Sequence, residues 1–148
     1  MRMMPSLVRD IMTRSVVTVN ADATIDHMRR LFEEQGFHHL LVRESHRVVG
    51  VVSDRDLLRH LSPWAGTMGE SKSDAATLRK RAHQIMSRGL VSVRSEQTVL
   101  EAIRAMLGAS VSCLPVLDEH GRPDGIVTWR DILRWTADQL ELEARDAA

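Results

Sequence analysis

The same pattern occurs twice along this sequence, and the duplication constrains the fold more than any other feature. The two copies align at an offset of 74 residues. The matching segments are Ile11-Met12 with Ile85-Met86, Val17-Thr18-Val19 with Val91-Ser92-Val93, and, after one inserted residue near Gly121, Gly50 to Asp56 with Gly125 to Asp131. The offset is too long for a solenoid repeat and too short for two large independent domains. We therefore expect two small, related units.

Hydrophobic periodicity predicts the same order of elements, strand–helix–strand–strand–helix, in each copy. In the first copy the strands are expected at residues 15–19, 38–43 and 48–53, with helices from an N-cap at Asp22 to Gly36 and over residues 54–61. In the second copy the strands are expected at residues 90–93, 112–117 and 125–128, with helices over residues 97–107 and from Trp129. Gly108 and the turn at residues 119–123 punctuate this copy.

A βαββα unit of this size leaves apolar surface uncovered and would be marginally stable alone. We therefore expect an α/β (α+β) fold in which two βαββα units pack about a pseudo-two-fold axis, with ligand clefts between them. The predicted ranges are 1–61 for the first domain, 62–82 for a linker and 83–148 for the second domain with its C-terminal helix. Within the linker we expect a short helix at residues 75–82, and Trp64 is expected to pack on a domain surface.

Composition excludes several classes of function. Twenty basic residues balance twenty acidic ones, and no block of like charges offers the electrostatic footprint of a nucleic-acid or membrane binder. The single cysteine, Cys113, cannot form an intramolecular disulfide; it fits a small buried hydrophobic position and a cytoplasmic location. The histidines are scattered, and no HExxH, nucleophile elbow, P-loop or GxGxxG pattern occurs, so we expect neither an enzyme nor a metal site.

Each copy ends in a Gly-h-h-(Ser/Thr)-x-Arg-Asp signature, where h is apolar, at the point where a strand runs into a helix. The positive end of the helix dipole favours a phosphate there, which the hydroxyl of Ser53 or Thr128 and the guanidinium of Arg55 or Arg130 can also reach. Asp56 or Asp131 can accept hydrogen bonds from both hydroxyls of a ribose. The base would lie against Val16, Val17 and Leu40 in one copy, and Leu90, Val91, Leu114 and Pro115 in the other.

The same residues have a purely structural interpretation. Ser and Asp at a helix start are ordinary capping residues, and the arginine can pair with a neighbouring acid. Recurrence in both copies favours function, although duplication also preserves structural caps.

The duplicated βαββα unit, the Asp10-Ile11-Met12-Thr13 and Gln84-Ile85-Met86-Ser87 openings, the Leu114-Pro115-Val116 strand and the doubled signature resemble a tandem cystathionine-β-synthase (CBS) domain pair, or Bateman module. The resemblance covers nearly the whole chain. It implies that Ser53, Asp56, Thr128 and Asp131 contact phosphate and ribose. It also implies base contacts from the first and second strands, so Ser15, His39 and Cys113 join the predicted sites.

We therefore expect a regulatory sensor that acts in trans and requires no cofactor. The expected ligand is AMP, ADP or ATP, with NAD and S-adenosylmethionine as alternatives, and the resemblance suggests a homodimer with an unknown protein target. The second hypothesis is an interaction module that dimerises without ligand, using the apolar residues at 132–142.

The two copies differ at two positions near the predicted sites. Leu41 of the first copy corresponds to Pro115 of the second, and Asp54 of the first corresponds to Trp129 of the second, so the two sites are expected to differ. We expect Trp129 to pack at a subunit contact rather than on a ligand.

Overall fold

The structure, a computed structural model, describes residues 6–148, so the first five residues of the predicted first domain lie outside it. The chain forms two compact units that cut across the sequence order. The first unit is Val17–Leu90, and the second combines the segment up to Val16 with Val91–Ala148. Each unit mixes a small sheet with helices, which confirms the predicted fold class. The opening segment of each copy, up to Val16 in the first copy and from Ala82 to Leu90 in the second, therefore lies in the unit formed by the other copy.

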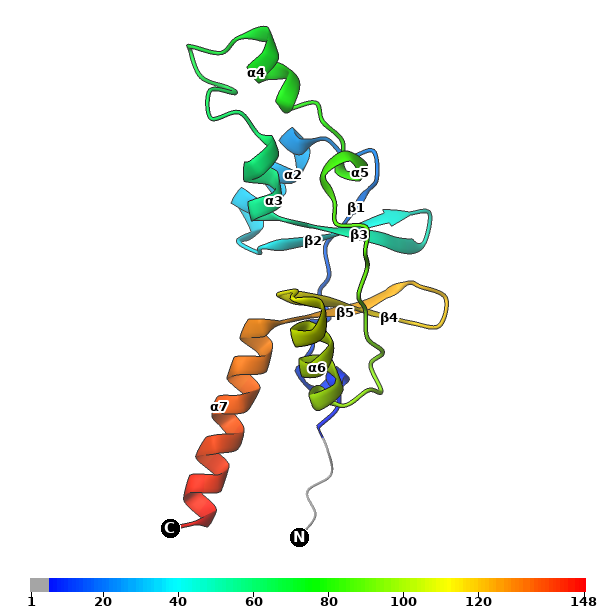
Figure 1. Cartoon of the computed structure of the whole chain (residues 1–148), viewed down its shortest axis with the longest axis vertical. Helices are drawn as coiled ribbons and strands as arrows, with labels where there is room; N and C mark the ends of the chain where they lie inside the picture. The colour runs from blue at the N-terminus through cyan, green and yellow to red at the C-terminus, as the bar shows by residue number, and fades with distance from the viewer. Residues whose placement is uncertain (1–5) are drawn as a thin grey trace. The chain divides into compact units, whose positions relative to one another are not determined.

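The first unit contains a three-stranded sheet with helices on one side (Figure 1). Its elements are β1 (Thr18–Asn20), α2 (Ile25–Gln35), β2 (His39–Glu44), β3 (Arg47–Ser53), α3 (Asp54–His60), α4 (Lys72–Thr77) and α5 (Ala82–Ile85). Strand β1 is parallel to β2, and β2 is antiparallel to β3. The predicted βαββα order is confirmed in this copy, with the first strand displaced from 15–19 toward the helix.

Helix α2 shows how the sequence determines an element and its buried face. Ile25 and Met28 on its apolar face are fully buried, and Gly36 ends the helix at a φ of 69°, in the left-handed region that glycine adopts without a Cβ penalty. The predicted cap at Asp22 is wrong. The side chain of Thr24 accepts the His27 N–H at 3.2 Å instead, since Asp22 lies in the turn that precedes the cap.

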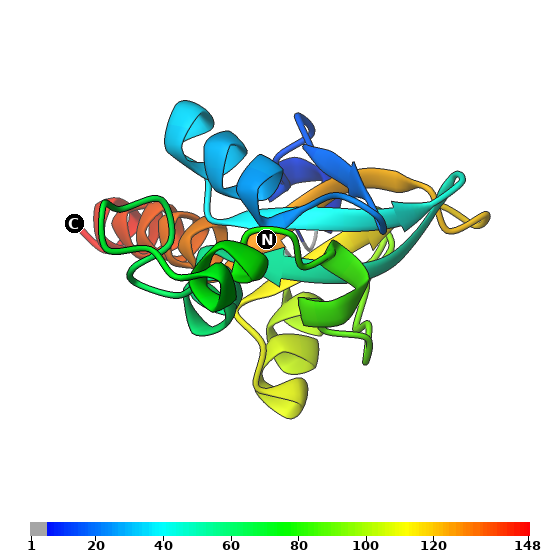
Figure 2. The ribbon, with the colours of Figure 1, turned by 90° about the horizontal axis from the view of Figure 1, so that it is seen from above.

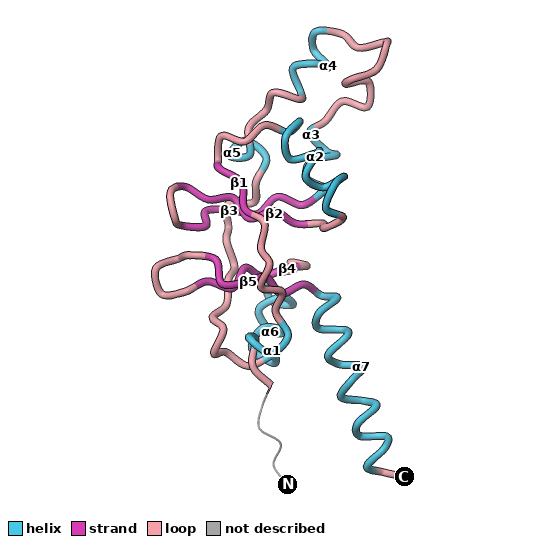
Figure 3. The backbone as a smooth tube through the Cα atoms, turned by 180° about the vertical axis from the view of Figure 1, so that it is seen from behind, coloured by secondary structure: helices cyan, strands magenta, loops and turns pink. Residues whose placement is uncertain are grey.

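The second unit contains α1 (Val8–Ile11), α6 (Val99–Ala109), β4 (Cys113–Leu117), β5 (Pro123–Thr128) and α7 (Trp129–Asp146). Helices α1 and α6 lie on the same side of the β4–β5 hairpin (Figure 3). The predicted strand at residues 90–93 is wrong: only Val93 forms an isolated parallel bridge, to Val116. Gly108 lies inside α6, and Ser110 caps that helix in the left-handed conformation.

Pro115 accounts for part of this difference between the copies. In the first unit the Leu41 N–H donates to the Val17 carbonyl at 3.2 Å, which ties the segment before β1 to the sheet. Pro115 occupies the position of Leu41, and proline has no backbone N–H to donate to the equivalent Val91 carbonyl. The segment before α6 is therefore held to β4 by two backbone hydrogen bonds of Val93. The Val93 N–H donates to the Pro115 carbonyl and the Leu117 N–H donates to the Val93 carbonyl, each at 3.0 Å.

The opening segments pack closely against the signature glycines. Ser87 exchanges two backbone hydrogen bonds with Val51, and Thr13 does the same with Ile126. A Cβ atom at Gly50 would lie 2.5 Å from the Met86 sulfur, and one at Gly125 would lie 2.8 Å from the carbonyl oxygen of Thr13. The glycine of each signature therefore admits the opening segment of the other copy.

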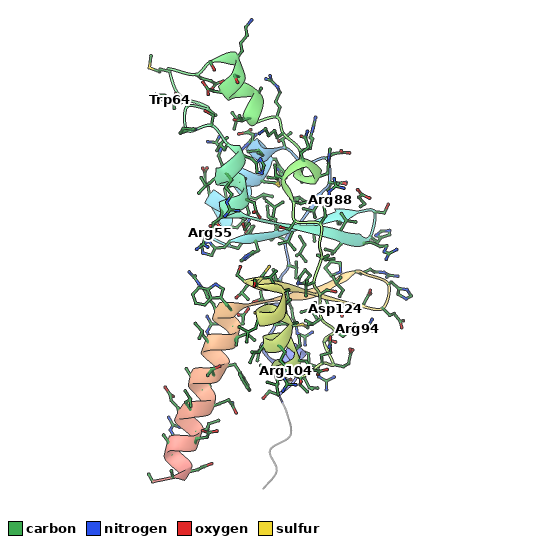
Figure 4. All side chains as sticks on the ribbon, in the orientation of Figure 1. Arg55, Trp64, Arg88, Arg94, Arg104 and Asp124 are labelled. Atoms are coloured by element: carbon green, nitrogen blue, oxygen red, sulfur yellow. The ribbon has the colours of Figure 1, made fainter. Side chains whose placement is uncertain are left out.

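The linker differs from its prediction in two respects. Residues 75–82 do not form one helix: α4 begins at Lys72 and ends at Thr77, and α5 begins at Ala82. Trp64 does not pack on a domain surface, since it is 62% exposed in a loop closed by local hydrogen bonds (Figure 4).

We expect Gly125→Ala to lower the free energy of unfolding by about 1–3 kcal/mol, because the new methyl group would overlap the Thr13 backbone. Urea denaturation of the ligand-free protein measures this effect. Gly108→Ala is the matched control: nothing lies within 4 Å of its Cβ position. Alanine in the interior of α6 should therefore stabilise the protein by about 0.5–1 kcal/mol. Equal stability of Gly125→Ala and the parent protein would contradict the close-approach argument.

Candidate functional site

In the first unit the signature hydroxyl and carboxylate bind each other. Ser53 caps α3, where its Oγ accepts the Asp56 N–H at 3.1 Å and donates to Asp56 Oδ2 at 2.8 Å. The same carboxylate oxygen accepts the Ser53 N–H at 2.8 Å. This reciprocal capping box fixes both side chains at the junction of strand and helix.

The second unit repeats this arrangement with a more buried acid. Asp131 Oδ2 accepts the Thr128 N–H at 2.8 Å and the Thr128 hydroxyl at 3.0 Å. Its other oxygen, Oδ1, lies 3.6 Å from Nη1 of Arg134. Asp131 is 9% exposed. Among residues 6–148 it is the one charged or polar residue that is as buried as the hydrophobic core. A carboxylate this buried needs hydrogen-bond donors, and its Oδ1 keeps capacity to accept more.

The capping interpretation is therefore realised in the structure, but capping alone does not distinguish these acids. Thr98 with Glu101 on α6, and Ser71 with Asp74 on α4, form the same kind of box. What sets Ser53 and Thr128 apart is the strand that runs directly into each helix, with an arginine inside the first turn. Because each signature hydroxyl already donates to its own aspartate, contact with a phosphate requires it to change that partner.

The charges around the two signatures differ. Arg55 and Arg130 are both exposed, and Figure 4 shows Arg55 beside the start of α3. The Arg130 guanidinium lies 5.6 Å from the ring centroid of Trp129, in cation–π range. In the first unit Asp54 replaces this aromatic ring, and its Oδ2 lies 2.8 Å from Nδ1 of His38. The first signature thus carries a second carboxylate where the second carries an indole.

Burial lowers the pKa of His39 below its usual value, because desolvation disfavours the charged imidazolium. Asp54 and Asp56 oppose this shift, while His38 and Arg55 add to it. His39 pairs with Ser53 across the β2–β3 ladder, and Cys113 pairs with Thr128 at the equivalent place. The hairpins therefore bring His39 and Cys113 to their signatures, and Cys113 is buried, as expected.

The predicted base-contacting residues occupy two kinds of position. Leu40 and Leu114 belong to the hydrophobic cores of their units. Pro115, the next residue along β4, is also buried, but strand alternation turns it to the opposite face from Leu114. Val17 and Val91 are half-buried. Val17 begins the first unit, and Val91 begins the longer segment of the second unit.

The exchange of opening segments divides the predicted site residues. Ser15 and Val16 belong to the second unit, although they were predicted with Ser53 and Asp56, and Leu90 belongs to the first unit.

Two exposed arginines beside these residues, Arg14 and Arg88, were not predicted from the sequence. The Val16 N–H donates to the Arg14 carbonyl at 2.9 Å, and the Leu90 N–H donates to the Arg88 carbonyl at 2.8 Å, which closes the same tight turn in both copies. The alignment at 74 residues could have found this arginine pair.

Within residues 6–148, no group of three or more His, Cys, Asp or Glu side chains could hold a metal ion. In that same part of the chain, no helix has the length and apolar character needed to span a bilayer.

Comparison with known proteins identifies the family. The CBS domain matches residues 8–63 and 82–138, and the chain therefore belongs to the CBS domain family, as a tandem pair. A CBS domain-containing protein of Dictyostelium discoideum is 33% identical over 132 residues, which are 88% of this chain and 90% of that protein. The match at both copies confirms the resemblance drawn from the sequence.

Solved structures of CBS proteins have a fold similar to that of this chain. The CBS domain pair of protein MJ0100, solved with 5-methylthioadenosine and S-adenosyl-L-methionine, has a TM-score of 0.76 and 22% identity, covering 92% of this chain and 99% of that one. CBSX2, solved with AMP, has a TM-score of 0.73 and 28% identity over 92% of this chain and 98% of its own. Other curated relatives are longer: the chain spans 47% of an uncharacterised protein of Methanocaldococcus jannaschii and 23% of a homoserine O-acetyltransferase of Methanohalobium evestigatum.

We expect the His39 ring protons to titrate below pH 6.5 in the folded protein, with the midpoint measured by NMR. A lowered folded-state pKa means that the unfolded chain binds the proton more tightly. The contribution of His39 to stability is thus complete above the unfolded-state pKa and decreases as the pH falls through it toward the folded-state pKa. His39→Gln should reduce this acid sensitivity. A midpoint at or above 6.5 would contradict the argument from burial.

Proposed function

We propose that this chain is a non-enzymatic sensor that binds an adenosyl ligand at the signature residues and regulates a protein target in trans, in the cytoplasm. The observation that carries this proposal is Asp131, a carboxylate buried at a strand-to-helix junction with Oδ1 able to accept hydrogen bonds, in a chain of the CBS family. Two proteins of similar fold were solved with adenosyl compounds: MJ0100 with 5-methylthioadenosine and S-adenosyl-L-methionine, and CBSX2 with AMP.

The proposed roles follow from the hydrogen-bond inventory of each group. Asp131 Oδ2 accepts the Thr128 N–H and hydroxyl, so Oδ1 would accept the ribose hydroxyls. Arg130 would move from the face of Trp129 to a phosphate oxygen, and the Thr128 hydroxyl would turn to the same group. The N-terminus of α7 adds a favourable dipole for an anion. Ser53, Arg55 and Asp56 would act equivalently in the first unit.

We propose that the second signature binds a phosphorylated ligand more tightly than the first. Asp54 adds a negative charge beside the first signature, and His38 offsets it only when protonated. The second signature has Trp129 at that position, which carries no charge. Like charges disfavour each other most where water screens them least, so a phosphate should prefer the second signature.

Regulation requires more than binding. A ligand shifts a conformational equilibrium only as far as its affinities for the two states differ, and a partner protein senses the ligand only by recognising one of those states. A trans-acting sensor would therefore change its affinity for the target when the ligand is added.

We expect Asp131→Ala to weaken AMP binding ten- to a hundredfold, equivalent to about 1.5–3 kcal/mol, the scale of hydrogen bonds to a charged group. Isothermal titration calorimetry measures the dissociation constant. Glu101→Ala is the matched control, since it removes the carboxylate of an equivalent capping box on α6. It should lower thermal stability similarly but leave AMP affinity unchanged. Full affinity in folded Asp131→Ala would rule out the ribose assignment.

A calorimetric panel of AMP, ADP, ATP, S-adenosylmethionine and NAD tests the proposal as a whole. We expect at least one of these ligands to release or absorb heat and to raise the melting temperature. The alternative, a ligand-independent dimerisation module, predicts no response to any of them. The observation that favours this alternative is the exposure of Trp129 and three leucines on α7, which a second protein surface could cover.

A further inference from the structure

The first signature places two carboxylates where the second places one. Asp54 and Asp56 both lie in the first turn of α3, whereas Asp131 is the one acidic residue in the first turn of α7. Negative side chains in a first turn are stabilised by the positive end of the helix dipole. Because α3 has only seven residues and two such acids, its own side chains already compensate the positive end that an anionic ligand would use.

The first backbone N–H groups of α3 also have partners within the unit. The Asp54 N–H donates to the His38 carbonyl at 3.1 Å, and the Asp56 N–H donates to Ser53 Oγ at 3.1 Å. In Figure 2 the β2–β3 hairpin (cyan to green) turns at one end of its sheet, and α3 follows from the other end, where β2 begins. The hairpin thus brings His38 to the start of α3, and an anion there would compete with these bonds.

Asp54 is held at this place by a second hydrogen bond to the same residue. Its Oδ2 lies 2.8 Å from Nδ1 of His38, and the side chains of Asp54 and His38 are 40% and 52% exposed. A neutral imidazole can donate this hydrogen bond, but it leaves the charge of the carboxylate uncompensated. In the second unit the backbone bond recurs, from the Trp129 N–H to the Ser112 carbonyl at 3.0 Å, with side chains that carry no charge. The two copies therefore share a geometry and differ in charge.

Other charged groups near the first signature do not cancel this difference. Burial lowers the pKa of His39, so its imidazole is neutral at neutral pH and adds no positive charge. Arg55 has an equivalent in Arg130, and it therefore favours an anion equally in both copies. The difference that remains is the carboxylate of Asp54.

We propose that Asp54 makes the first signature select an adenosyl ligand whose group on the ribose 5′ carbon is neutral or cationic, such as a thioether, a sulfonium or an amine, instead of a phosphate. This inference rests on the proposed function, because it assigns a class of ligand to one of the two proposed sites. Asp56 would bind the ribose in either case. The Asp54 carboxylate repels a phosphate beside Ser53 and attracts a cation at the same place. The two signatures would thus sort adenosyl ligands by charge.

The structural alternative assigns Asp54 to helix stability alone. A first-turn acid can stabilise α3 through the dipole without affecting which ligand binds. The ratio of two dissociation constants separates these roles, because a loss of stability does not change the preference between two ligands of the same shape. Solvent screens the partly exposed Asp54 carboxylate, so we expect its effect on each ligand to be about three- to fivefold.

Single-site variants allow each signature to be measured alone. Asp131→Ala leaves the first signature intact, and Asp56→Ala leaves the second. The probes are AMP, adenosine and 5′-amino-5′-deoxyadenosine, which differ only in the charge of the 5′ group. Isothermal titration calorimetry slightly above neutral pH, where histidine is neutral, gives their dissociation constants. We expect the amine to bind most tightly at the first signature and AMP to bind most tightly at the second.

Removal of the carboxylate tests Asp54 directly. In the Asp131→Ala background, Asp54→Asn should strengthen AMP binding and weaken binding of the amine, which changes the ratio of their dissociation constants about tenfold. Asparagine keeps the size of the side chain and an oxygen that can accept from His38. Asp26→Asn is the matched control, since it removes a carboxylate from the first turn of α2. It should lower thermal stability and leave the ratio unchanged.

The outcomes distinguish this inference from the proposed function. If the single-site variants bind adenosine and AMP but show the same preference at both signatures, or if Asp54→Asn leaves the ratio unchanged, the selection by charge is overturned while the sensor proposal stands. If the parent protein binds none of the three probes, both are overturned. Asp131→Asn and Asp56→Asn replace the alanine variants if circular dichroism shows those to be unfolded, because asparagine keeps one oxygen for the cap.

Discussion

The fold depends on one close backbone approach that occurs in each unit. The opening segment of one copy crosses the strand of the other at the signature glycine, where the Thr13 and Ser87 backbones exchange hydrogen bonds with Ile126 and Val51. Side chains larger than hydrogen are excluded at Gly50 and Gly125. Through this crossing Val8 enters the core of the second unit, and Ala82 and Ile85 enter the core of the first. A unit too small to enclose its own core is completed by a segment distant in the sequence.

The signature therefore combines three physical requirements within a few residues. Its glycine admits the crossing segment, its hydroxyl and aspartate cap the helix, and the arginine between them stays exposed. The cap and the proposed ligand contact use the same aspartate: one carboxylate oxygen serves the cap, and the other is the atom proposed to bind ribose. Substitutions there must be compared with an equivalent cap elsewhere, which the Thr98–Glu101 box provides.

The two copies have diverged at and beside the signature residues. Pro115 removes a backbone donor that Leu41 supplies, and the first strand of the second copy is reduced to a single bridge. Trp129 replaces Asp54, which exchanges a carboxylate for an indole beside the neighbouring arginine. The copies thus share a scaffold while differing in charge and in backbone hydrogen bonding, which is the basis for proposing unequal sites.

The sequence by itself determined the duplication, the order of elements in the first copy, the buried face of α2 and the family, because periodicity, glycine positions and the repeated signature can be read along the chain. It did not determine the cap of α2, where Asp22 and Thr24 were both suitable, or the short α4. The tertiary structure alone decided that Ser15 and Val16 belong with the second copy and Leu90 with the first, since long-range pairing fixes which strand an opening segment crosses. It also decided which apolar residues of α7 stay exposed, because helical spacing identifies a stripe but only packing shows which stripe the unit covers.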